Sequence, residues 1–357
     1  MLEGVDIRRR TSLTALTSIP AGLALALTGV VPAQADDTAY VALGDSFSAG
    51  TGTRNSTDDC YRSPYGYPAL IAGAQGLTLD YQACSGATTA DVLANQVGSL
   101  GPDTGLVTMT IGGNDLGFAD VITECAQPGW LSDCAGAIAG GRAILQNELP
   151  GRYDAVLGAI AAAAPAADVR IGGYPHLFNG EDCNAATFFS PEEMADLNAA
   201  TDELDALVEQ KTLGAGYTFV DPRDAFDGHA VCDDVEWVNG LSWPIVESFH
   251  PNRDGNIGYA DEFWPGSGSA AAATVPADRT AQGVEASVRQ EADAVLAMDL
   301  ASPANLRAAQ AAGISPDRIT GLVEQLRSAD TDVVAGALAE LSALDEQHDQ
   351  RVVAYRG

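Results

Sequence analysis

Residues able to perform acyl-transfer chemistry stand in four short polar blocks along the chain. The blocks are Gly-Asp-Ser-Phe at residues 44–47, Cys-Ser-Gly at 84–86, Gly-Gly-Asn-Asp at 112–115 and Ser-Phe-His-Pro-Asn at 248–252. A serine hydroxyl becomes a good nucleophile only when a base accepts its proton, and imidazole can do so near neutral pH. Each block alone is typical of a turn or a helix cap, so the prediction depends on all four together.

The strands and helices predicted around these blocks place the first three at one edge of a sheet. Short apolar runs typical of buried strands occupy residues 40–43, 77–81, 106–111, 169–171 and 217–220. Apolar residues at helical spacing predict helices over 142–164 and 191–213, and the second begins with a capping box from Ser190 to Glu193. This alternation predicts an α/β fold, a parallel sheet between two layers of helices. In such sheets the active site lies beyond the carboxyl ends of the strands.

Taken together and in this order, the four blocks resemble those of the SGNH (GDSL) hydrolase superfamily. The stretches 40–52, 83–91, 108–119 and 247–252 are similar to its branch of exported bacterial lipases, esterases and phospholipases A. The resemblance covers about residues 38–264 and implies a three-layer flavodoxin-like sandwich with a central parallel sheet. It also implies that the chain hydrolyses carboxylic esters through an acyl-enzyme on Ser46.

The resemblance further implies a set of hydrogen-bond donors around the reacting carbonyl. The Ser46 N–H, the Gly86 N–H and the Asn114 side-chain amide would form the oxyanion hole. The chemistry agrees, because a tetrahedral intermediate needs preorganised neutral donors, each of which can contribute about 3–4 kcal/mol. The sequence around Ser46 is not Gly-x-Ser-x-Gly, which excludes the α/β-hydrolase arrangement for this serine.

His250 is the predicted general base, by its block and by elimination. The chain has four histidines, of which His176, His229 and His348 stand outside the blocks. We interpret the first two as solvated or locally hydrogen-bonded loop residues, and the third belongs to the C-terminal tail.

The group that orients the imidazole of His250 is left open by the sequence. Many members of the superfamily place Asp three residues before the histidine, and here that position holds Glu247. The branch that this chain resembles often uses a main-chain carbonyl instead, for which Ser248 is the candidate. We favour a Ser46–His250 dyad supported by that carbonyl over a triad with Glu247. Asp45 and Asp115 are expected to bond backbone groups around their own turns.

The cysteines fall into three pairs that are local in sequence. An even number in an exported chain favours disulfides over zinc, and no Cys-x-x-Cys or His-x-x-x-His spacing supports a metal site. Fifteen connectivities are possible, so the pairing rests on proximity, and the spacing is similar to that of the resembled branch. The expected disulfides are Cys60 with Cys84, Cys125 with Cys134, and Cys183 with Cys232. No metal and no cofactor is expected.

Residues 1–35 are predicted to be a signal peptide. Three arginines at 8–10 precede a mostly apolar stretch at 13–31, and Ala33-Gln34-Ala35 fits the cleavage rule of signal peptidase. A membrane anchor is the competing interpretation, which Pro20 and the cleavage site oppose. The mature protein is therefore expected to be secreted and extracellular, by the Sec or the twin-arginine route.

Composition excludes several classes of partner. The chain of 357 residues has 49 acidic against 18 basic residues and a formal net charge of −31, which opposes binding to nucleic acid and to anionic membranes. Stable membrane insertion is not expected, because no segment after the predicted signal peptide is long and apolar enough to span a bilayer. The expected partner is an ester or lipid substrate.

Composition also predicts the domain organisation: a hydrolase domain over residues 36–264, a Gly/Ser/Ala linker over 265–282, and a helical extension over 283–357. The extension shows the spacing of three or four helices, with no evident catalytic residue, so its role and any protein partner stay unknown. Two alternatives to the esterase remain open. One is a polysaccharide deacetylase of the same fold, and the other is a non-catalytic envelope or partner-binding protein that works through the helical tail.

Overall fold

The computed structural model describes residues 39–272 and 284–356, and these belong to one folded unit, Ala35–Gly357. The predicted signal peptide lies outside the described residues. Within the described ranges no helix has both the length and the apolar character needed to cross a bilayer.

Five parallel strands form the central sheet, as predicted. They are β1 (Ala39–Gly44), β2 (Thr78–Tyr81), β3 (Leu106–Thr110), β4 (Asp168–Gly172) and β5 (Thr218–Val220), in the order β2-β1-β3-β4-β5. Strands β1 and β3 lie side by side, and every residue of them but Ala39 is buried, as expected for strands covered on both faces. Gly44 is paired with Thr110, so the first and third blocks begin next to each other at the same edge.

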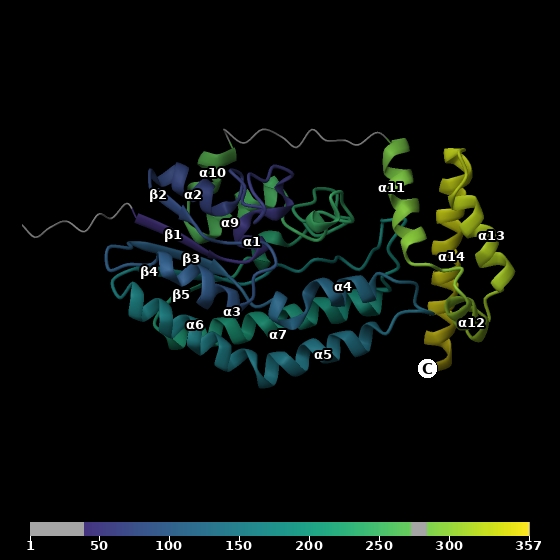
Figure 1. Cartoon of the computed structure of the whole chain (residues 1–357), viewed down its shortest axis with the longest axis horizontal. Helices are drawn as coiled ribbons and strands as arrows, with labels where there is room; N and C mark the ends of the chain where they lie inside the picture. The colour runs from purple at the N-terminus through teal and green to yellow at the C-terminus, as the bar shows by residue number, and fades with distance from the viewer. Residues whose placement is uncertain (1–38, 273–283, 357) are drawn as a thin grey trace, which may run out of the picture. The chain divides into compact units, whose positions relative to one another are not determined.

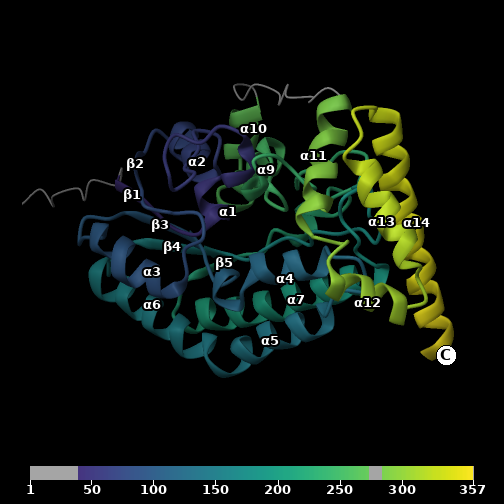
Figure 2. The ribbon, with the colours of Figure 1, turned by 45° about the vertical axis from the view of Figure 1, so that its right-hand side comes forward.

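Helices cover both faces of the sheet (Figures 1 and 2). One face carries α2 (Tyr67–Gln75), α9 (Arg253–Phe263) and α10 (Ser267–Ala272), and the other carries α4 (Phe118–Cys125), α5 (Cys134–Asn147), α6 (Leu149–Ala163) and α7 (Pro191–Gly214). Short helices complete the connections: α1 (Ser46–Ala49), α3 (Thr89–Asp91) and α8 (Arg223–Phe226), with single turns at η1 (Thr51–Thr53), η2 (Val92–Gln96), η3 (Val97–Ser99), η4 (Asn114–Leu116) and η5 (Ile245–Glu247). The three-layer α/β prediction is confirmed.

The single helix predicted over residues 142–164 is wrong. Helix α5 already begins at Cys134 and ends at Asn147, and α6 begins at Leu149. Pro150 stands in the first turn of α6, where its missing N–H does no harm, whereas inside one continuous helix it would remove a hydrogen bond. Helix α7 begins as predicted, with Ser190 and Glu193 forming the capping box.

Part of the predicted linker is helical. Residues 267–272 form α10, which packs against α2 and α9. The Ser267 hydroxyl is buried there and accepts a hydrogen bond from Gln75 Nε2 at 3.2 Å. Residues 267–272 therefore pack on the hydrolase fold, and residues 273–283 lie outside the described part of the chain.

The C-terminal extension contains α11 (Val284–Ala297), α12 (Pro303–Ala311), α13 (Pro316–Leu326) and α14 (Thr331–Arg356), which pack together (Figure 2). Their shared core is apolar and includes Val295, Leu322, Leu338 and Leu341. Trp130 and two residues of the loop before α7, Ala186 and Phe188, join the same apolar cluster. The domain boundaries drawn from composition stay a prediction.

Candidate active site

Ser46 is positioned by the sharp turn at the end of β1. Gly44 has φ +120°, and a Cβ there would lie 2.3 Å from the Thr110 carbonyl oxygen, so no larger residue fits. The carboxylate of Asp45 then caps α1 by accepting the Phe47 N–H at 3.0 Å. Ser46 is the first residue of this short helix and is buried.

The imidazole of His250 contacts the Ser46 hydroxyl. Its Nε2 lies 2.7 Å from Ser46 Oγ, and its Nδ1 lies 2.8 Å from the Ser248 carbonyl oxygen. A carbonyl oxygen only accepts, so Nδ1 carries the proton and Nε2 is left to accept one from the serine. Phe249 between them has φ +58° and is buried against Phe178 and Phe189, which favours this turn despite its strained backbone.

The Glu247 carboxylate takes no part in these two contacts. Its side chain is buried, and its carboxylate accepts the N–H of Arg54 at 3.1 Å. The group on His250 Nδ1 is therefore the Ser248 carbonyl rather than the Glu247 carboxylate.

Burial sets the protonation of His250. Loss of hydration lowers its pKa to about 4, and the hydrogen bond to Ser248 opposes that shift only in part. The imidazole is thus neutral above this value, in the form that can accept a proton.

The three predicted oxyanion donors come from the first three blocks. The Asn114 side-chain amide donates to the Ala87 carbonyl at 3.0 Å, next to Gly86, and has a second N–H to give. Within the described residues, the N–H groups of Ser46 and Gly86 donate to no protein acceptor.

Two carboxylates tie the blocks to their neighbours. Asp45 accepts from the hydroxyl of Thr110 at 2.9 Å in addition to its own turn. Asp115 accepts the Thr89 N–H at 2.9 Å and hydroxyl at 2.6 Å, and pairs with Arg152 at 3.1 Å. The expectation that both bond their own turns is thus right for Asp45, and wrong for Asp115, which links the third block to the loop after β2.

Sequence reasoning missed two residues that hold these loops. Gln96 bonds both backbone groups of Gly44, at 2.7 and 2.9 Å. Tyr174, after the end of β4, donates its hydroxyl proton to Asp45 and accepts the Gly113 N–H. The pair Gly172-Gly173 repeats the pattern after β3, so the strand-end rule could have singled out Tyr174, whereas nothing local marks Gln96.

A mostly apolar depression adjoins the serine. A cavity of about 50 Å³ is lined by Ser46, Asn114 and Tyr174 together with Phe118 and Leu177. An adjoining cavity of about 80 Å³ shares Gly113, Phe118, Leu177, Thr201 and Leu204 with it and extends between α4, α5 and α7. A larger cavity of about 940 Å³ lies against α14 and includes none of the predicted catalytic or oxyanion-hole residues.

The other predicted residues lie outside this cluster. The structure contains the three expected disulfides: Cys60–Cys84, Cys125–Cys134 and Cys183–Cys232. Two of the remaining histidines have hydrogen-bond partners, as interpreted: His176 bonds Asp202 at 3.0 Å, and His229 bonds the Val235 carbonyl at 2.7 Å. His348, in α14, meets Trp130 edge to face.

Relatives of known activity match most of the chain. The GDSL-like Lipase/Acylhydrolase family model matches residues 42–256. Lipase 1 of Streptomyces coelicolor is 40% identical over 262 residues, covering 71% of this chain and 96% of that protein. A lipase of Streptomyces rimosus is 40% identical over 256 residues, covering 70% of this chain and 94% of that protein.

Solved structures of such enzymes have the same fold. The extracellular lipase of Streptomyces rimosus superposes with a TM-score of 0.60 at 38% identity, covering 66% of this chain and 99% of that one. Phospholipase A1 of Streptomyces albidoflavus superposes with a TM-score of 0.59 at 36% identity, covering 65% of this chain and 98% of that one. The chain therefore belongs to the GDSL-like lipase/acylhydrolase family and is a carboxylic ester hydrolase.

Proposed function

We propose that Ser46 and His250 perform the reaction as a dyad. Ser46 Oγ attacks the ester carbonyl carbon while His250 Nε2 accepts the hydroxyl proton. The intermediate collapses, the alcohol leaves with the proton from Nε2, and the acyl group stays on Ser46. Water then attacks in the same way and releases the acid. The 2.7 Å contact between Nε2 and Oγ is the observation that carries this proposal.

The oxyanion in both steps would be held by the Ser46 N–H, the Gly86 N–H and the Asn114 amide. Backbone N–H groups without a protein acceptor are suited to this role, since they need not break an existing hydrogen bond when charge develops. The Ser248 carbonyl would hold the imidazole in the productive tautomer and stabilise the imidazolium.

We propose lipid esters with an acyl chain longer than acetyl as the substrates. The apolar walls between α4, α5 and α7 begin at Ser46 and would bury acyl methylenes at about 0.8 kcal/mol each. This favours a lipid over an acetylated polysaccharide. The phospholipase A1 among the structural relatives makes a phospholipid the second candidate.

Hydrolysis of nitrophenyl esters from acetate to palmitate, alongside a phospholipid, tests this function. We expect kcat/KM to rise with chain length until the apolar walls are filled. Leu197→Asp, which places a charge in those walls, should depress the longer esters selectively. Best activity on acetate, with no selective loss in the variant, would contradict the lipid assignment.

Glu247→Gln tests what orients His250. If the Ser248 carbonyl does so, the variant should keep kcat within about 3-fold, because the amide oxygen can still accept the Arg54 N–H. A loss of about 10⁴-fold, the size expected for a triad carboxylate, would restore the Glu247 triad.

Secretion is proposed from the predicted signal peptide. The three disulfides and the extracellular lipase among the relatives support it. Mass measurement of protein from culture medium should give a chain that begins at Asp36.

A further inference from the structure

Tyr174 contacts the first and third blocks with one hydroxyl. The hydroxyl donates to Asp45 Oδ2 and accepts the Gly113 N–H at 3.2 Å. Asp45 immediately precedes Ser46, and Gly113 immediately precedes Asn114. A single buried hydroxyl thus links the residue before the nucleophile Ser46 to the residue before Asn114, whose side-chain amide would bind the oxyanion.

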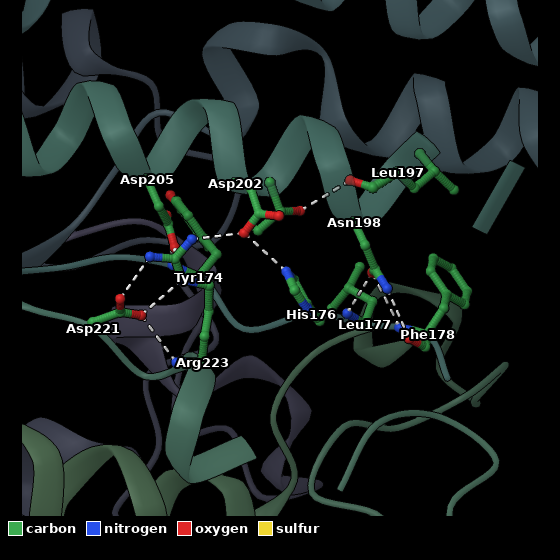
Figure 3. A network of polar contacts seen from close by, with 11 residues as sticks. Tyr174, His176, Leu177, Phe178, Leu197, Asn198, Asp202, Asp205, Asp221 and Arg223 are labelled. Atoms are coloured by element: carbon green, nitrogen blue, oxygen red, sulfur yellow. Dashed lines mark hydrogen bonds and ion pairs between the residues drawn. The ribbon is translucent and has the colours of Figure 1, made fainter. Parts of the chain in front are cut away.

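The backbone of Tyr174 is itself anchored. Asp205 accepts its N–H with both carboxylate oxygens, at 2.9 and 3.2 Å. Figure 3 shows Asp205 and Asp202 pointing from α7 toward Arg223 of α8, whose Nε lies 3.7 Å from Asp205. A Cβ at Gly173 would lie 2.6 Å from the Asp205 carboxylate, so this approach requires glycine. The end of β4 is therefore a rigid base for the tyrosine ring.

The ring has packing contacts that do not depend on the hydroxyl. Phe47 meets it edge to face, with centroids 5.0 Å apart. Gly113 lies at the hydroxyl end of the ring, where an added Cβ would be 3.6 Å from Cζ. Replacing tyrosine by phenylalanine would keep these contacts and remove only the bridge.

We propose that Tyr174 is a positioning residue for the oxyanion hole. Its hydroxyl sets the spacing between the Ser46 N–H and the Asn114 amide by holding the residues that precede them. The inference rests on the proposed function, because it acts through the oxyanion donors assigned there. Without the hydroxyl, Asp45 loses a donor and the Gly113 N–H loses its acceptor, so the two loops can separate.

Tyr174→Phe tests the bridge, with Tyr40→Phe as the matched control. Tyr40 of β1 is buried in the same core, and its hydroxyl bonds the Thr108 hydroxyl of β3 at 2.6 Å without touching either loop or the end of β4. On nitrophenyl acetate we expect Tyr174→Phe to lower kcat about 10- to 100-fold with KM nearly unchanged, since a displaced donor costs transition-state binding. Tyr40→Phe should keep kcat while losing comparable thermal stability. Equal kcat in the two variants would overturn the inference.

A double variant shows whether Tyr174 acts through the amide. Once Asn114→Ala has removed that donor, adding Tyr174→Phe should lower kcat by less than about 3-fold. Full additivity of the two losses would overturn the positioning role. If Ser46→Ala and Asn114→Ala were themselves without effect, the proposed function would fail. If they abolish or depress activity and Tyr174→Phe does not, only this inference fails.

Discussion

Buried polar side chains have more hydrogen-bond partners around Ser46 than in the C-terminal helices. Near Ser46, the carboxylate of Asp45 has three donors, and both imidazole nitrogens of His250 have partners. Among the side chains described from residue 287 to 354, Asp345 is the one buried ionisable group. It accepts the Gly129 N–H at 2.7 Å but faces Asp349 and Glu193, and burial raises its pKa to about 8.

The two regions therefore differ in the kind of contact that holds them together. A buried polar network is costly unless every member is hydrogen-bonded, and a fully hydrogen-bonded network makes its surroundings rigid. The loops at the strand ends have such a network, whereas the C-terminal helices are held mainly by apolar contacts. The family match also ends at residue 256, before these helices begin. We therefore interpret the helices as an added packing unit rather than part of the chemistry.

The largest effect should come from the dyad. Ser46→Ala and His250→Ala should each lower kcat by about 10⁴-fold or more, because the two side chains act as a unit. The unfolding temperature of Ser46→Ala should stay close to that of the wild type, because only one hydroxyl is lost, whereas His250→Ala removes a buried ring and should lower it. The double variant should be no worse than either single one. Substantial activity left in Ser46→Ala would place the nucleophile elsewhere.

The pH dependence should be set by the burial of His250. The neutral imidazole is the active form, so kcat/KM should rise with pH and reach half its plateau near pH 4 rather than near the ordinary histidine pKa of about 6.5. The folded pKa is lowered, so the contribution of His250 to stability is present above pH 6.5 and declines as the pH falls toward 4. Folding must therefore be monitored by circular dichroism at each pH. An acid limb near pH 6.5 in folded protein would mean that His250 is hydrated.

The C-terminal region should respond to pH in the opposite direction. The folded pKa of Asp345 is raised, so its stabilising proton is held at low pH and lost as the pH rises toward 8. Asp345→Asn keeps an acceptor for Gly129 without the charge, and should raise the free energy of unfolding at pH 8 by about 1 kcal/mol or more. At pH 4 the two proteins should be alike. Glu346→Gln removes a charge from an exposed neighbour on α14 and should change little.

Truncation should have the smallest effect on chemistry. A chain ending after Ala272 retains all four blocks and α10, and should keep kcat/KM on a water-soluble ester within about 3-fold. Its stability should fall, because Trp130 and Phe188 lose their apolar cover. Ending at Gly266 instead removes α10 and should destabilise the hydrolase part further. A folded but inactive truncated chain would show that the C-terminal helices help to build the site.

The elements and the blocks could be predicted because their signals are local. A buried strand such as β1 is a continuous apolar run, and Ser190 with Glu193 marks the start of α7. The first three blocks each follow the end of a strand. The cysteine pairs also follow from proximity along the chain. A predicted helix boundary was wrong where a single residue ends one helix and begins the next, as Pro150 does in the first turn of α6.

The sequence by itself therefore determined the strands of the sheet and the blocks that follow the first three of them. It also marked Ser46, Asn114 and His250 as candidates for the site. Tertiary structure decided which group meets His250 Nδ1, and which side chains hold the loops together. Glu247 and Ser248 are neighbours along the chain, and only the turn at Phe249 selects the carbonyl. Tyr174 is more than 120 residues from Asp45, and their contact exists because β4 ends beside β3 in the folded sheet. Such choices depend on distances of a few tenths of an ångström between distant segments, which residue types and spacing do not encode.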